Sequence, residues 1–175
     1  MDHRSLCRQA GLTLVEVLIV VILMGIVAAM AIPRFSTTTK DVQASTLEAN
    51  LSALRNAIEL YAAQHGGRFP GQYDAADGTT PAATAAAAQD AFRAQLTQYT
   101  DANGKTSATL DTTHYPFGPY LRKGIPENPM PTPSNTLVVD MTASGAITGK
   151  GGTGGWKFAT KTGQIIANHP DDKDR

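Results

Sequence analysis

The chain has 175 residues, with 15 basic and 15 acidic side chains, so its formal net charge at pH 7 is zero. This balance implies no basic footprint for nucleic acid, which we do not expect as a partner. The length allows one modest domain beside an anchor. The only cysteine, Cys7, lies near the N-terminus. A chain from which the first 11 residues had been removed could therefore form no disulfide.

A polar leader, residues 1–11, opens the chain and carries the positive charges of Arg4 and Arg8. Basic residues that flank a membrane helix stay on the cytoplasmic side. We therefore expect this end of the following helix to face the cytoplasm and the rest of the chain to lie outside. Removal of the leader would take away two basic residues and one acidic residue, Asp2, which leaves 13 against 14 and a net charge of minus one.

An apolar run from Leu12 to Ile32 follows the leader. It is 21 residues long, and it is interrupted by three residues: Thr13, Glu16 and Gly25. A helix of this length measures about 31 Å, which matches the hydrocarbon core of a bilayer. The run therefore predicts a transmembrane helix over residues 12–33.

A carboxylate inside this run, Glu16, calls for an explanation. An acidic residue near the centre of a membrane helix costs about 2.5 to 3.5 kcal/mol, although the cost falls towards the end of the span. We therefore expect Glu16 to have a purpose beyond anchoring. Pro33 closes the apolar run, and because a helical pattern resumes after it, we expect a kink there within one long helix.

The start of the run follows a signature of Gly, an apolar residue, Thr, Leu, an aliphatic residue and Glu, with Gly and Pro at set offsets further on. These residues are Gly11, Leu12, Thr13, Leu14, Val15, Glu16, Gly25 and Pro33. This pattern resembles the N-terminus of the type IV pilin and type II secretion pseudopilin family, in which Gly precedes the cleavage point. Leu12 departs from the Phe that is usual in that family.

The resemblance implies that a membrane-embedded prepilin peptidase cuts between Gly11 and Leu12 and methylates the new α-amine of Leu12. In a bundle of apolar helices a carboxylate needs a partner, and the Leu12 amine of a neighbouring subunit supplies the cation for Glu16. Gly25, with Pro33 beyond it, would mark a weak segment that kinks or unwinds during assembly.

Two other interpretations of the N-terminus stay open. Ala29, Met30 and Ala31 form an A-x-A-like end to an apolar core, as in a secretory signal peptide. A simple one-span anchor would also explain the length of the run. Neither explains a Gly followed at fixed distance by Glu16.

A second apolar pattern follows Pro33 and has spacings of four, three, four and three residues. Its members are Leu47, Leu51, Leu54, Ile58 and Tyr61. This is the buried stripe of an amphipathic helix, which we expect over residues 34–66, with Gly66 and Gly67 ending it. The two helical segments together would make one helix of about 50 residues.

Residues 67–175 predict a globular α+β head. An alanine-rich segment, residues 82–99, carries Phe92, Leu96 and Tyr99 at helical spacing, which favours a short second helix. A proline-rich loop follows around Pro126 and Pro129. Residues 72–114 have no counterpart that we can identify in the family and resemble an insertion.

Three strands are expected near the C-terminus, at residues 136–141, 156–159 and 164–167, with a tight hairpin over residues 160–163. They predict a small antiparallel sheet packed on the second half of the long helix, as in a pilin-like fold. The core would join the stripe of the long helix to strand residues Val138, Trp156 and Ile165.

No arrangement of side chains predicts catalysis, and we expect a protein that is not an enzyme. The four histidines, His3, His65, His114 and His169, lie far apart and at no metal-ligand spacing. Major pseudopilins bind calcium in the loop before their Trp-bearing strand. The corresponding stretch here, residues 140–156, offers one acid, Asp140, whereas calcium takes six to eight oxygens. We expect no cofactor and leave Asp140 as a weak candidate for calcium.

The resemblance implies a subunit of a type II secretion pseudopilus that drives protein export. Its partners would be other copies of the chain, minor pseudopilins, the prepilin peptidase, an assembly ATPase and an inner-membrane platform. The subunit would first sit in the inner membrane as a single-pass protein with its head in the periplasm, and then in a periplasmic filament. A type IV pilin and a membrane-anchored periplasmic binding domain are the alternatives.

Overall fold

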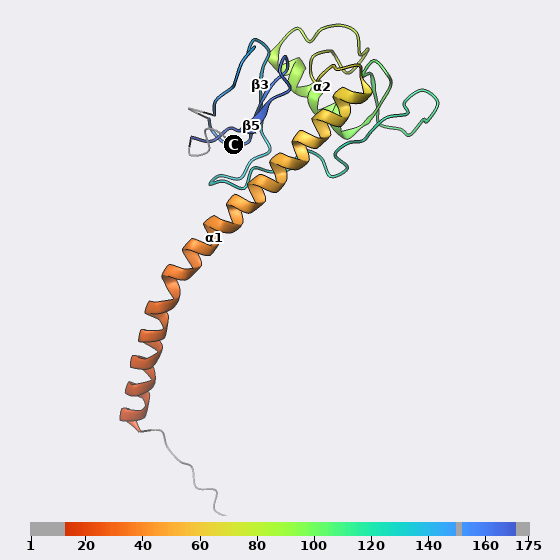
Figure 1. Cartoon of the computed structure of the whole chain (residues 1–175). Helices are drawn as coiled ribbons and strands as arrows, with labels where there is room; N and C mark the ends of the chain where they lie inside the picture. Colours follow the sequence, from red (N-terminus) through yellow and green to blue (C-terminus); the bar gives the residue numbers. More distant parts are fainter. Residues whose placement is uncertain (1–12, 150–151, 171–175) are drawn as a thin grey trace, which may run out of the picture. The chain divides into compact units, whose positions relative to one another are not determined.

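The computed structural model describes residues 13–149 and 152–170, together with the side chains of all these residues except 29–38. The chain divides into two units, one ending at Val42 and the other beginning at Gln43. Both contain part of the same long helix, and the second also contains every other element (Figure 1).

The long helix, α1 (Leu14–Gln64), has 51 residues. It begins after Thr13, whose Oγ1 accepts a hydrogen bond from the backbone N–H of Glu16 at 3.2 Å. At the other end, the N–H of Gly67 donates to the carbonyl of Ala62 at 2.8 Å, and Gly66 adopts a φ of +64°. This is a Schellman ending, so the predicted stop at the two glycines is confirmed.

In the first unit, the large apolar side chains of α1 are exposed from Leu14 to Val27. Among the described residues, no helix is both long and apolar enough to cross a membrane. The transmembrane span predicted over residues 12–33 is therefore not confirmed by the structure. The backbone is helical on both sides of Pro33, and the kink expected there stays a prediction.

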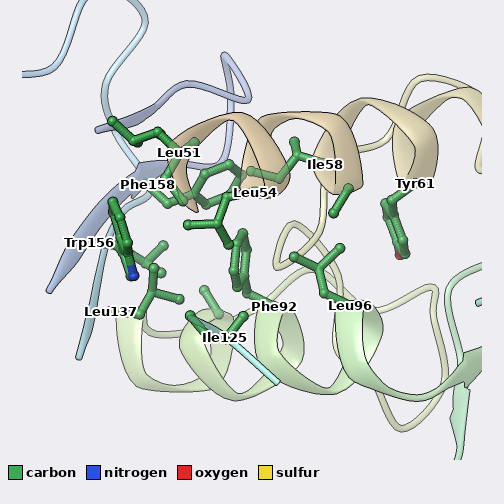
Figure 2. Close-up of a cluster of buried hydrophobic side chains, with 14 of the residues drawn as sticks. Leu51, Leu54, Ile58, Tyr61, Phe92, Leu96, Ile125, Leu137, Trp156 and Phe158 are labelled. Carbon is green, nitrogen blue, oxygen red and sulfur yellow. The ribbon is translucent and has the colours of Figure 1, made fainter. Parts of the chain in front are cut away.

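In the second unit, the predicted stripe of α1 forms one side of the core. All five members are buried: Leu47, Leu51, Leu54, Ile58 and Tyr61. Figure 2 shows side chains of α1 facing those of a second helix, with Trp156 and Phe158 beside them. The spacing of four and three residues thus identified the buried face of α1 correctly.

The second helix, α2 (Ala85–Thr97), begins at Thr84, whose Oγ1 accepts a hydrogen bond from the N–H of Ala87 at 3.1 Å. Phe92 and Leu96 of α2 are buried, and the ring centroids of Phe92 and Phe158 lie 4.6 Å apart. The predicted helix is confirmed, except that Tyr99 lies beyond it. Tyr99 starts a two-residue strand, β1 (Tyr99–Thr100), which pairs antiparallel with β2 (Thr106–Ser107).

A three-stranded sheet has the order β3-β4-β5, with β3 (Leu137–Asp140), β4 (Trp156–Ala159) and β5 (Ile165–Ala167). β4 and β5 form the predicted antiparallel hairpin. β3, however, runs parallel to β4, so the prediction of a wholly antiparallel sheet was wrong. Parallel neighbours need a connection of about a dozen residues or more, and residues 141–155 are long enough to return the chain to the start of the sheet.

The buried face of β3 also differs from the prediction. Val138 is 38% exposed, whereas Leu137 and Val139 on either side are 2% and 6% exposed. Successive side chains of a strand point to opposite faces, so a shift of one residue exchanges the two faces. Three consecutive apolar residues carry no alternation that would have indicated the correct face. Trp156 and Ile165 are buried as predicted.

Candidate assembly site and the head that carries it

The start of α1 is built by Thr13 and Glu16. The backbone N–H of Glu16 donates to both the carbonyl and the hydroxyl of Thr13, at 3.1 and 3.2 Å. A Thr followed three residues later by Glu is the spacing of a capping box. Sequence reasoning assigned a role to Glu16 and overlooked Thr13, although this spacing is visible in the sequence.

Glu16 lies in the first turn of α1 with its side chain exposed. Its neighbours along the helix, including Ile19 and Val20, are exposed apolar residues. Any partner that covers this surface also removes water from the carboxylate, which is costly unless the partner brings a cation or hydrogen-bond donors. From Leu14 to Val27 the helix therefore presents one acidic group, Glu16, within an exposed apolar surface.

Gly25 lies on the same helix, and a Cβ added there would meet no atom within 4 Å. Packing within the described chain thus does not require a glycine at this point. Leu23, Met24, Val27 and Ala28 line an open apolar hollow nearby. A glycine in a helix interior costs about 1 kcal/mol relative to alanine, so Gly25 weakens this part of the helix without a local packing benefit.

Gly11 and Leu12, the expected cleavage and methylation positions, lie outside the described residues, as does the side chain of Pro33. Their roles stay predictions.

Asp140, the weak calcium candidate, lies at the end of β3. Its Oδ1 accepts three hydrogen bonds, from the N–H of Thr142 at 3.0 Å, the hydroxyl of Thr142 at 2.9 Å and the N–H of Ala143 at 2.9 Å. These bonds, the one from the Thr142 N–H first, hold the pKa of Asp140 below its usual value. In the described ranges, no three acidic, histidine or cysteine side chains are grouped as metal ligands. Asp140 thus serves as the cap of a turn.

His65, for which the sequence indicated no role, is buried at the end of α1. Its Nδ1 lies 2.7 Å from the carbonyl oxygen of Tyr61, and its Nε2 lies 3.1 Å from Oγ1 of Thr100. A carbonyl can only accept, so Nδ1 carries the proton and Nε2 accepts from the Thr100 hydroxyl. Burial lowers the pKa of His65. The imidazole therefore joins the end of α1 to strand β1.

A family model described as the prokaryotic N-terminal methylation motif matches residues 6–32. The type II secretion system core protein G of Aeromonas hydrophila is 28% identical over 86 residues, which cover 49% of this chain and 59% of that protein. The type IV narrow pilus major component PilA5 of Thermus thermophilus is 35% identical over 57 residues, which cover 33% of this chain and 49% of that protein.

A fimbrial protein of Pseudomonas aeruginosa is 43% identical over 51 residues, which cover 29% of this chain and 33% of that protein. The chain therefore spans between about a third and three fifths of the length of these relatives. No solved structure matches it. The matched motif contains Thr13, Glu16 and Gly25, the residues that build the start of α1 and its weak point. This chain thus carries the prokaryotic N-terminal methylation motif and is similar, over part of its length, to type IV pilins and to a type II secretion core protein.

Proposed function

We propose that this chain is a structural subunit of a type II secretion pseudopilus, a periplasmic filament that drives protein export. The observation that carries the proposal is the position of Glu16, a carboxylate in the first turn of α1 among apolar side chains that are exposed from Leu14 to Val27. A filament core of packed helices would cover those side chains once α1 has left the bilayer, so that they are not exposed to water.

Cleavage after Gly11 supplies the charge that such packing needs. It creates an α-amine on Leu12, one residue before the cap residue Thr13. This amine, methylated by the prepilin peptidase, pairs with Glu16 of a neighbouring subunit, because a buried carboxylate needs a cation nearby. The pairing fixes the register between subunits, and no pair forms before the leader has been removed.

The same scheme assigns a role to the weak helical segment that contains Gly25 and Pro33. α1 leaves the bilayer for the filament core, and a helix containing Gly25 and Pro33 can unwind or bend there at small cost. The subunit waits in the inner membrane with its leader in the cytoplasm and its head in the periplasm. An assembly ATPase, its membrane platform and minor pseudopilins act on it, and the subunit itself is not an enzyme.

The test of processing is the intact mass and N-terminal sequence of the protein recovered from its native membrane. We expect a chain that begins at methylated Leu12. Gly11→Val should block the cut, whereas Ala10→Val, the same substitution type one residue earlier, should not. A mature chain that begins at Ile32 would support a signal peptide, and an uncut chain would support a simple anchor; either result contradicts the proposal.

A type IV pilin is the second candidate, favoured by the similarity to PilA5 and to the fimbrial protein. It shares the processing and differs in the filament. Long surface filaments at native expression would identify a pilin, whereas filaments confined to the periplasm would identify a pseudopilin. A membrane-anchored binding domain would form neither.

A further inference from the structure

The loop that precedes Trp156 has to hold a parallel strand in place, and its described residues, 141–149 and 152–155, form no strand. Residues 141–155 connect β3 to β4 and contain no acidic residue. The family resemblance implies a calcium ion here, and Asp140 is the acid nearest to the loop. Its Oδ1 already accepts three hydrogen bonds from Thr142 and Ala143. The residues present therefore do not fit a calcium ion, which takes six to eight oxygens, usually with several charges.

Asn128 donates a hydrogen bond to the carbonyl oxygen of Gly155, one of the backbone oxygens that a cation in this loop would need. Its side chain is 1% exposed, and Nδ2 donates to the carbonyl of Gly155 at 2.8 Å. Oδ1 of the same side chain accepts from the N–H of Met130 at 3.0 Å. The partner at each end fixes the orientation of the amide, because a carbonyl cannot donate and an N–H cannot accept. Asn128 therefore presents its donor, not its oxygen, to the loop.

Asn168, the residue after β5, donates to the preceding carbonyl, that of Gly154. Its buried side chain donates through Nδ2 to the carbonyl of Gly154 at 3.2 Å. Its backbone N–H donates to the carbonyl of Gly155 at 2.9 Å, and its own carbonyl accepts from the N–H of Gly154 at 2.9 Å. The Gly155 carbonyl thus accepts two hydrogen bonds, which uses both of its lone pairs.

These bonds hold the backbone where β4 starts. The next residue, Trp156, donates its backbone N–H to the carbonyl of Thr136 at 2.7 Å and its indole Nε1–H to the carbonyl of Pro126 at 2.7 Å. The indole is fully buried. Fixing Gly154 and Gly155 therefore sets the position of the largest side chain of the core.

We propose that the amides of Asn128 and Asn168 fasten this loop in place of a cation, so that the head folds and keeps its stability without calcium. A carbonyl oxygen uses the same lone pairs to accept a hydrogen bond or to coordinate a metal, and here those of Gly154 and Gly155 face amide donors. The loop is closed by neutral groups whose bonds do not depend on the calcium concentration.

The calcium arm of the test uses the full-length wild-type chain in detergent. Its melting temperature should be the same, within about 1 °C, in a millimolar excess of EGTA and in millimolar CaCl2. Metal analysis after dialysis against CaCl2 should find far less than one calcium per chain. A rise of several degrees with CaCl2, or one bound calcium per chain, would overturn the proposal.

The amide arm uses Asn128→Asp and Asn168→Asp, which keep the size of the side chain and replace the donor with a carboxylate. Each should lower the melting temperature in EGTA by about 3 to 10 °C, the effect of a buried donor lost from a chain of this size. Asn135→Asp is the matched control, because Asn135 is exposed. Melting of both variants at the temperature of the control would refute the role of the amides. If a variant fails to fold, Asn168→Ser, which is smaller and neutral, measures the same bond.

Discussion

The imidazole of His65 stacks on the phenol ring of Tyr61 one helical turn earlier, with the ring centroids 3.9 Å apart and the planes inclined by 11°. The rings of Phe117 and Tyr120 meet His65 edge-on, at centroid distances of 5.4 and 6.4 Å. The last turn of α1 thereby joins the loop that follows the β1–β2 hairpin through an aromatic cluster. One member of this cluster, His65, is a titratable group whose pKa is lowered by its burial.

The stability of the head should fall as the pH drops below about 6.5. Burial lowers the pKa of His65, with Arg68 acting in the same direction, while hydrogen bonds to Tyr61 and Asp101 and the charge of Asp101 oppose the shift. The unfolded chain then binds a proton at a pH at which the folded head does not. The free energy of unfolding is therefore retained above the unfolded pKa and decreases below it, by at most about 1.4 kcal/mol per pH unit.

Urea unfolding of the full-length chain in detergent between pH 7.5 and 5 measures this dependence. His65→Gln should remove most of it. The lowered pKa values of Asp77, Asp111 and Asp140 act at lower pH, because their unfolded values lie near 4. Equal pH dependence in wild type and His65→Gln would contradict the assignment.

Truncation of the core stripe should destabilise the head in proportion to burial. Leu54 is 0% exposed and Leu60, six residues later on the same helix, is 51% exposed. Leu54→Ala should cost about 2 to 5 kcal/mol, since it leaves a cavity between α1 and α2. Leu60→Ala should change the free energy of unfolding by less than about 1 kcal/mol. Chemical denaturation of both variants tests the difference, and equal losses would show that the stripe is not the core.

Gly155 should tolerate alanine far less well than Gly66 does, although both have a positive φ, +75° and +64°. A Cβ on Gly155 would overlap the carbonyl of Thr136, whereas one on Gly66 would meet no atom within 4 Å. Gly66→Ala should therefore cost only the left-handed strain, about 1 to 2 kcal/mol. Gly155→Ala should cost that and a displacement of β3 from β4. Similar melting temperatures for the two variants would argue against the close approach of Gly155 to Thr136.

Replacement of Glu16 separates assembly from anchoring. If the carboxylate pairs with the Leu12 amine of a neighbour, Glu16→Leu leaves that amine buried and unpaired, a loss of about 3 to 5 kcal/mol per contact. The variant should still be cut after Gly11 and should form no filaments. Val17→Leu, an apolar substitution at the next residue, should assemble normally. The measurement compares processing with sheared or cross-linked filaments, and normal filaments from processed Glu16→Leu would remove the physical basis of the proposed assembly.

Features that depend on neighbours in the sequence could be predicted from the sequence alone. Three features rest on residues that lie close together in the sequence: the stripe from Leu47 to Tyr61, the end of α1 at Gly66 and Gly67, and the β4–β5 hairpin. Helical periodicity, left-handed glycines and short turns arise from interactions between residues close in the sequence, so their sequence patterns predict them. The N-terminal motif could be recognised for the same reason, because its residues lie close together in the sequence.

Only the tertiary structure decided the contacts between distant residues. The parallel pairing of β3 with β4 and the hydrogen bond from Asn128 to Gly155 join residues that lie far apart in the sequence. The exposure of Val138 follows from how β3 packs on the core. Three consecutive apolar residues indicate no face, and an isolated asparagine indicates no partner. Which carbonyl an amide reaches, and whether a histidine such as His65 is solvated or buried, depends on how the whole core packs, because these contacts form only when distant segments are brought together.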